Sequence, residues 1–129
     1  MRYILALLAI ALPLRFALVA NDSPSAAALL GTWSGTEQLP NGTKMSLQMK
    51  LEPGMKFSGT VAVNGNVVWE YSGSWSLAGN TLTWNYEKSS NPLPEAAKVD
   101  VDQIVSINPK RLVLLSKQSG KQHEFQRTP

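Results

Sequence analysis

The chain has 129 residues, of which 43% are apolar and 16% charged, and its formal net charge at pH 7 is +3. This length is that of a single domain. The sequence contains no cysteine, which excludes a disulfide-stapled miniprotein, a zinc finger and a cysteine-dependent enzyme. Its one histidine leaves little for histidine-based catalysis or metal ligation, and its small, mixed charge argues against a nucleic-acid partner.

The first 20 residues have the composition of a secretory signal peptide. Arg2 precedes an apolar run of about 12 residues, Tyr3 to Leu14, and a tail that ends at Ala20. A membrane-spanning helix needs roughly 20 residues, so we expect cleavage after Ala20, no retained transmembrane segment, and a secreted or periplasmic location. An uncleaved signal anchor is the alternative. Because Arg15 also lies in this segment, the mature domain, residues 21–129, is nearly neutral.

A short helix is predicted immediately before the β-rich part of the chain. Ser23 is a suitable N-cap, Pro24 suits the first helical position, and Gly31 suits the residue that ends a helix. The alanine-rich segment between them predicts one to two helical turns.

From Gly31 onward, apolar and polar residues alternate with a period of two. The segment 44–51 is the clearest example, because methionine or leucine stands at every odd position and a polar residue at every even one. Turn signals such as Asn41-Gly42 and Asn64-Gly65 separate these runs. The pattern predicts antiparallel strands at residues 31–38, 43–52, 56–64, 66–77, 80–88, 99–108, 110–117 and 120–127. Since an open sheet would leave two exposed edges, we expect an all-β, eight-stranded, antiparallel up-and-down barrel.

Gly31-Thr32-Trp33, which follows the predicted helix and begins a meander of strands, resembles the Gly-x-Trp signature of lipocalins and the wider calycin group. The resemblance covers the order of elements and one three-residue motif. It implies a lipocalin-like barrel in which Trp33 closes one end under an arginine of the last strand, for which Arg127 and Arg111 are candidates. The chain is shorter than typical lipocalins and lacks their Thr-Asp-Tyr motif and long C-terminal helix.

Two other kinds of small exported barrel begin in a similar way. Avidins share Gly-x-Trp, but their biotin-binding pattern cannot be placed in this sequence. Periplasmic inhibitors of metalloproteases have a comparable start but generally carry a disulfide, which a chain without cysteine cannot form. The compact lipocalin-like domains of secreted bacterial proteins are the most similar group.

The inward positions of the predicted barrel are rich in aromatic side chains. A barrel of eight strands either fills with its own side chains or holds one small ligand. Gly59 and Gly73 share the inward phase and favour a cavity, because they leave room where a side chain would otherwise lie. We therefore expect a small apolar ligand to contact Trp69, Tyr71, Trp75, Trp84, Tyr86, Met45 and Met49. Complete packing of these residues into a dry core is the alternative.

The predicted hairpin of residues 99–108 and 110–117 is apolar on both faces, so one face needs a cover. The short helix or the segment Pro92–Lys98 is one explanation. A protein partner or a second copy of the chain is the other, and its contact surface is then formed by Val105, Ile107, Val113 and Leu115. Under that alternative the protein is a periplasmic enzyme inhibitor or an envelope assembly factor.

The sequence offers no set of catalytic residues. His123 and Glu124 are neighbours and therefore point to opposite faces of a strand. Asp100 and Asp102 share one strand face, which suffices for weak contact with a cation but not for a metal-ligand set. No cofactor or metal is expected, and the favoured function is that of an exported, non-enzymatic barrel that binds a small apolar ligand.

Overall fold

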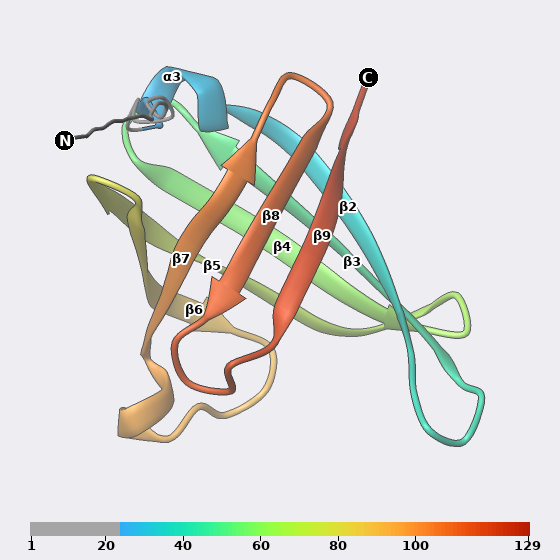
Figure 1. Cartoon of the computed structure of the whole chain (residues 1–129). Coiled ribbons are helices and arrows are strands. Elements are labelled where there is room, and N and C mark those ends of the chain that lie inside the picture. The colour runs from blue at the N-terminus through green and yellow to red at the C-terminus, as the bar shows by residue number, and fades with distance from the viewer. Residues whose placement is uncertain (1–23) are drawn as a thin grey trace, which may run out of the picture.

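The computed structural model describes residues 24–129, and in it eight antiparallel strands close into one barrel in sequence order, β2 to β9 (Figure 1). The pairing of β2 with β9, which sets Trp33 opposite Arg127, closes the cylinder. The predicted all-β barrel is therefore confirmed, with strand boundaries within two residues of those expected from the alternation. The strands are β2 (Gly31–Gln38), β3 (Lys44–Glu52), β4 (Lys56–Val63), β5 (Asn66–Ala78), β6 (Thr81–Ser89), β7 (Val99–Ile107), β8 (Arg111–Ser116) and β9 (Gln122–Thr128).

The predicted short helix is present as a single turn, α3 (Ala26–Leu29). Its N-cap is Ser25, whose side-chain oxygen accepts a hydrogen bond from the Ala28 backbone N–H at 3.1 Å. The prediction that Pro24 occupies the first helical position was wrong, because Pro24 precedes this cap. Ser23 and the predicted signal peptide, residues 1–20, lie outside the described residues.

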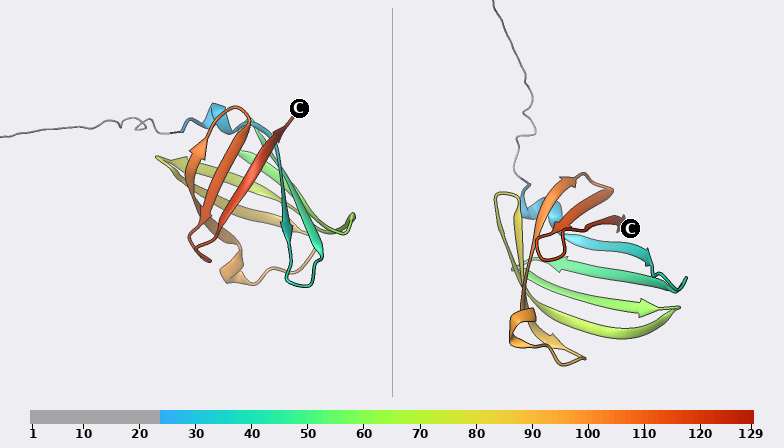
Figure 2. Two further views of the ribbon diagram at one scale, coloured as in Figure 1. Left: turned by 45° about the vertical axis from the view of Figure 1, so that its right-hand side comes forward. Right: turned by 60° about the horizontal axis from the view of Figure 1, so that its bottom comes forward.

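The two ends of the barrel carry different connections (Figure 2). Helix α3 lies against one end, and the long β6–β7 connection with its 3-10 turn η2 (Glu95–Ala97) lies at the other. No helix in the part of the chain that the structure describes is long and apolar enough to cross a membrane.

Three register shifts interrupt the ladders, and one of them lies at Gly73. It falls between Ser72 and Gly73 of β5. A Cβ atom on Gly73 would lie 1.9 Å from the backbone oxygen of Asn85, so only glycine fits against β6 at this point. A second shift, between Ile104 and Ser106 of β7, leaves Val105 without a partner in the β7–β8 register.

The most completely buried part of the core lies at the α3 end. Leu29, Trp33, Leu51, Leu82 and Leu112 are each at most 1% exposed. Four of them come from strands and Leu29 comes from α3 itself, and all five belong to one buried cluster. The side chains therefore fill this end of the barrel tightly, which leaves the middle and the opposite end as the place for a cavity.

Candidate functional site

Trp33 closes the α3 end of the barrel. Its indole Nε1–H donates to the Leu29 carbonyl oxygen at 2.9 Å, and its side chain is fully buried. The guanidinium carbon of Arg127 lies 4.2 Å from the centroid of the Trp33 ring. Arg127 also donates to the carbonyl oxygens of Ala28 and Leu30, at 2.8 and 2.6 Å, so it ties α3 to the last strand. This is the position that the resemblance gives to an arginine.

Gly31, the first residue of the Gly-x-Trp motif, makes room for this arrangement. Its φ of +127° lies in a region that favours glycine. A Cβ atom here would lie 2.5 Å from Nη1 of Arg127. Arg111, the other candidate cover for Trp33, instead pairs with Glu124 on β9.

A cavity of about 170 Å³ lies within the barrel, beyond the end that Trp33 closes. Aromatic rings form one wall of it. The ring of Phe57 meets Trp84 edge-on with centroids 4.9 Å apart and Tyr86 edge-on at 5.5 Å, while Tyr71 and Tyr86 are 5.4 Å apart. These rings support one another and present a rigid, largely apolar surface to the cavity. Leu47, Met49, Leu114 and Phe125 complete the apolar lining.

The predicted ligand contacts divide into two groups. Tyr71, Trp84, Tyr86 and Met49 line the cavity. Trp69, Trp75 and Met45 do not, because inward-facing residues of one long strand lie at different depths in the barrel.

Trp69, Trp75 and Met45 lie elsewhere in the barrel. Trp75 is buried at the filled end, where its indole donates to the Lys56 carbonyl oxygen at 3.0 Å. Trp69 packs behind Tyr71 with ring centroids 4.4 Å apart and donates to Ser89 Oγ at 2.7 Å. Met45 pairs with Glu37 near the β2–β3 turn. They surround the site without forming its surface.

The prediction that Gly59 and Gly73 leave room for a cavity was wrong. A Cβ atom on Gly59 would lie 2.4 Å from the ring of Tyr71, and one on Gly73 would collide with the backbone of β6. The Tyr71 ring therefore occupies the space beside Gly59. Gly59 contributes to the site by allowing this ring to approach β4 closely. The empty volume lies elsewhere, between the aromatic wall and β7 to β9.

Two carboxylates face the aromatic wall from β7. Asp100 pairs with Trp84 and Asp102 with Leu82 across the β6–β7 ladder, so both side chains take the inward phase. The Trp84 indole donates to Oδ2 of Asp102 at 2.8 Å, and the Val101 backbone N–H donates to Oδ1 of Asp100 at 3.0 Å. Both carboxylates line the cavity.

Asp102 and the tyrosines of the aromatic wall are partly shielded from solvent. Burial raises the pKa of Asp102 above its ordinary value, partly offset by the hydrogen bond from Trp84 and by His123, while Asp100 adds to the increase. Burial raises the pKa of Tyr71 to about 12. It also raises the pKa of Tyr86, with further contributions from Tyr71, Asp100 and Asp102. The hydroxyls of both tyrosines therefore keep their protons at neutral pH.

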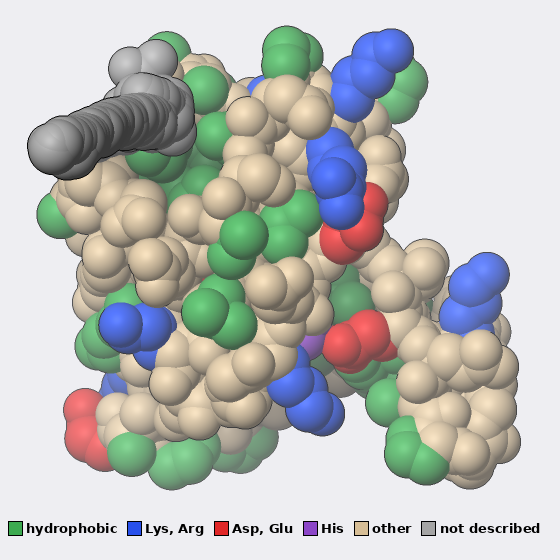
Figure 3. Space-filling view, viewed as in Figure 1, with side chains coloured by type: hydrophobic (Ala, Val, Ile, Leu, Met, Phe, Trp, Pro, Cys, Tyr) green, Lys and Arg blue, Asp and Glu red, His purple; other side chains and the backbone are tan. Residues whose placement is uncertain are grey.

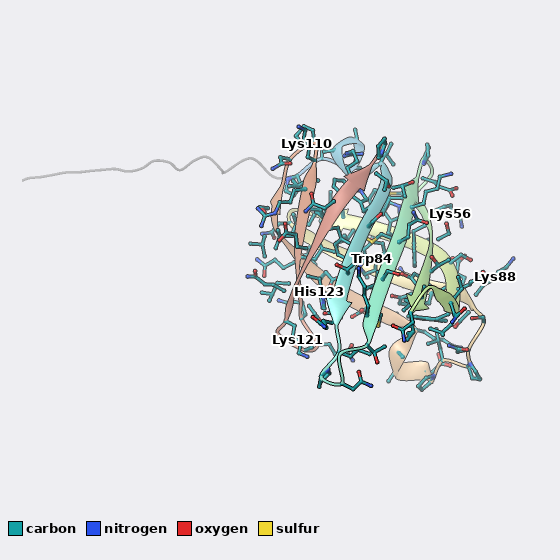
Figure 4. The ribbon with its side chains drawn as sticks, turned by 90° about the vertical axis from the view of Figure 1, so that its right-hand side faces the viewer. Lys56, Trp84, Lys88, Lys110, Lys121 and His123 are labelled. Carbon is teal, nitrogen blue, oxygen red and sulfur yellow. The ribbon has the colours of Figure 1, made fainter. Side chains whose placement is uncertain are left out.

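His123 of β9 completes the polar side of the cavity. Its Nδ1 lies 3.1 Å from Oε2 of Glu37 on β2. In Figure 3 a histidine side chain lies beside an acidic one at the edge of a hollow, and Figure 4 places His123 and Trp84 within the outline of the barrel. The sequence predicted that Asp100 and Asp102 share a strand face and that His123 points away from Glu124. It did not reveal that the two aspartates and His123 line the same cavity.

The hairpin residues proposed as a partner surface differ in exposure. Val105, at the bulge of β7, is 49% exposed, whereas Val113 is 6% exposed. Ile107 packs partly against the core cluster. Leu115 is half-buried. The four residues therefore do not form one continuous exposed apolar face.

No protein-family model matches the sequence, and a search of curated proteins found no match. Within residues 24–129, no group of three or more histidine, cysteine, aspartate or glutamate side chains is placed to hold a metal ion. The geometry of the cavity therefore carries the functional argument.

Proposed function

We propose that this protein is an exported, non-enzymatic, lipocalin-like barrel that binds one small, largely apolar ligand in its interior. The observation that carries the proposal is the cavity of about 170 Å³ against the wall of Phe57, Tyr71, Trp84 and Tyr86. An engineered apolar cavity of about 150 Å³ binds benzene. The volume therefore suits a single ring or a body of similar size, and it is too small for a long acyl chain.

The construction of the barrel supports the same proposal. The Trp33–Arg127 stack and the buried residues around it fill one end completely. The aromatic wall is held by ring-to-ring contacts and by the hydrogen bond of Trp84 to Asp102, so the site is formed before a ligand arrives. A preformed site binds without the cost of ordering its side chains.

Titration with toluene, a neutral single-ring probe, tests ligand binding. In a two-dimensional amide and indole NMR spectrum, we expect the indole N–H signal of Trp84 to shift saturably and that of Trp33 to stay in place. Leu47→Trp should fill the cavity and abolish the shift. Val67→Trp introduces the same side chain at an exposed position and serves as the matched control.

Two results would overturn the proposal: no saturable shift in the unmodified protein, or undiminished binding by folded Leu47→Trp. The export component is tested separately by the intact mass of the chain after expression with its own leader. We expect a mature chain that begins at Asn21.

A further inference from the structure

The charged side chains that line the cavity are negative. Asp100 and Asp102 line it, and no lysine or arginine is among its lining residues in the described part of the chain. In Figure 4 the labelled lysines, Lys56, Lys88, Lys110 and Lys121, lie around the margin of the barrel, away from Trp84 at its centre. The one basic lining group, His123, is already engaged by Glu37. The field inside the cavity therefore favours a positive charge.

Each carboxylate retains the capacity to accept a further hydrogen bond. Trp84 occupies Oδ2 of Asp102, and the Val101 N–H occupies Oδ1 of Asp100. Within residues 24–129, no hydrogen bond is made to the second oxygen of either group. Asp100 and Asp102 are partly buried, so each carboxylate loses part of its hydration while acceptor positions stay unfilled. A ligand that donates charged hydrogen bonds compensates for that loss.

The aromatic wall suits the same ligand. A cation near the face of a tryptophan, tyrosine or phenylalanine ring is attracted by the ring's negative face. Trp84 belongs to both parts of the site, because its ring lines the cavity while its N–H orients Asp102. The cavity thus combines an apolar compartment for a small ring with two carboxylates beside it.

We propose that the cavity selects a small organic cation, namely a protonated amine carried on a single ring or on an apolar body of similar size, with the ammonium group between Asp100 and Asp102 and the ring against the aromatic wall. This inference rests on the proposed function and specifies the class of its ligand. The cavity with its aromatic wall defines the site, and the carboxylates define the charge that it accepts.

Three probes of nearly identical shape test the charge preference: benzylammonium, benzyl alcohol and benzoate, titrated at neutral pH by the Trp84 indole signal and by calorimetry. We expect benzylammonium to bind at least about tenfold more tightly than benzyl alcohol, the increment of one charged hydrogen bond. Benzoate should bind more weakly than the alcohol, because its carboxylate meets two others.

The double variant Asp100→Asn, Asp102→Asn removes both charges and keeps the shape of the side chains. The new amide oxygen at position 102 can still accept the hydrogen bond from Trp84. We expect benzylammonium affinity to fall to that of benzyl alcohol, with the alcohol's own affinity changed less than about twofold. The double variant Glu52→Gln, Glu70→Gln removes two negative charges from residues that do not line the cavity. It is the matched control and should leave all three affinities unchanged.

The outcomes separate this inference from the proposed function. If benzylammonium and benzyl alcohol bind equally well, or if benzoate binds best, the inference is wrong and the barrel still binds small rings. Unchanged selectivity in the folded double variant also overturns it. If no probe binds the unmodified protein, the proposed function fails and the inference fails with it. The three probes are ranked with the unmodified protein, so the inference can be tested even if the double variant does not fold.

Discussion

The two ends of the barrel differ in how completely space is filled and polar groups are paired. At the α3 end Trp33 is fully buried, its N–H reaches the Leu29 carbonyl, and Arg127 satisfies two further carbonyl oxygens of the preceding segment. In the cavity beyond it, the carboxylates of Asp100 and Asp102 lie beside aromatic rings. One end is organised for stability, whereas at the other burial disfavours the charge of Asp102, as expected for the binding site that we propose.

We expect the largest loss of stability from a substitution at the filled end, where α3 lies. Trp33→Ala should destabilise the protein by about 3–5 kcal/mol, because it removes a fully buried ring and leaves a cavity beneath Arg127. Urea unfolding followed by circular dichroism measures this change. Trp69→Ala is the comparison, since this tryptophan is only partly buried and lies behind the cavity wall. Equal losses at the two positions would contradict the distinction between the ends.

We expect a smaller loss of stability from substitution of Arg127, the arginine that covers Trp33. Arg127→Lys keeps the positive charge but cannot donate simultaneously to Ala28, Leu30 and Pro109. We expect a loss of about 1–3 kcal/mol, the cost of leaving one or two carbonyl groups unpaired. Arg111→Lys, at the exposed pair with Glu124, is the control and should change the unfolding midpoint much less. Stability as high as that of the unmodified chain would show that Arg127 acts through charge alone.

The smallest change in stability is expected in the cavity, and there we expect a gain rather than a loss. Burial raises the pKa of Asp102, with Asp100, His123, Tyr86 and Trp84 as its neighbours. The folded state therefore holds this proton to higher pH than the unfolded state does, and stability declines as pH rises above the ordinary aspartate range through the raised value. Asp102→Asn should abolish that decline.

Thermal unfolding at pH 3 and pH 7 measures this difference. The variant and the unmodified protein should unfold at similar temperatures at pH 3, where Asp102 is protonated in both states. At pH 7 the variant should unfold at the higher temperature. Glu52→Gln is the control for loss of one negative charge. A variant that is less stable at pH 7 would mean that the hydrogen bond from Trp84 outweighs the cost of burying the carboxylate.

The alternation of residues predicted the strands well, and it predicted the cavity poorly. Met49, Tyr71, Trp84 and Tyr86 take the inward phase and line the cavity, yet Trp75 takes the same phase and is buried in the filled end. Phase tells which face a residue occupies, but it does not tell the depth along the barrel axis. Depth depends on strand tilt and on the register shifts in the β4–β5, β5–β6 and β7–β8 ladders.

The glycines illustrate the same limit. Gly59 faces inward as expected, but the ring of Tyr71 from the neighbouring strand lies over it. A missing side chain is therefore no sign of empty space, because close packing draws a neighbour into the gap. Likewise, the pairing of His123 with Glu37 joins β9 to β2 across the closure of the barrel, a contact between residues 86 positions apart that no local pattern reveals.

The sequence by itself determined the strand order, the turns and the face on which each side chain lies, because these follow from a period of two and from short-range turn chemistry. It also placed Asp100 and Asp102 together, since residues two apart on a strand share a face. Only the tertiary structure decided that their face turns toward Phe57, Tyr71 and Tyr86 and lines a space of about 170 Å³. Tilt, bulges and closure set those distances, and they depend on how all eight strands pack together.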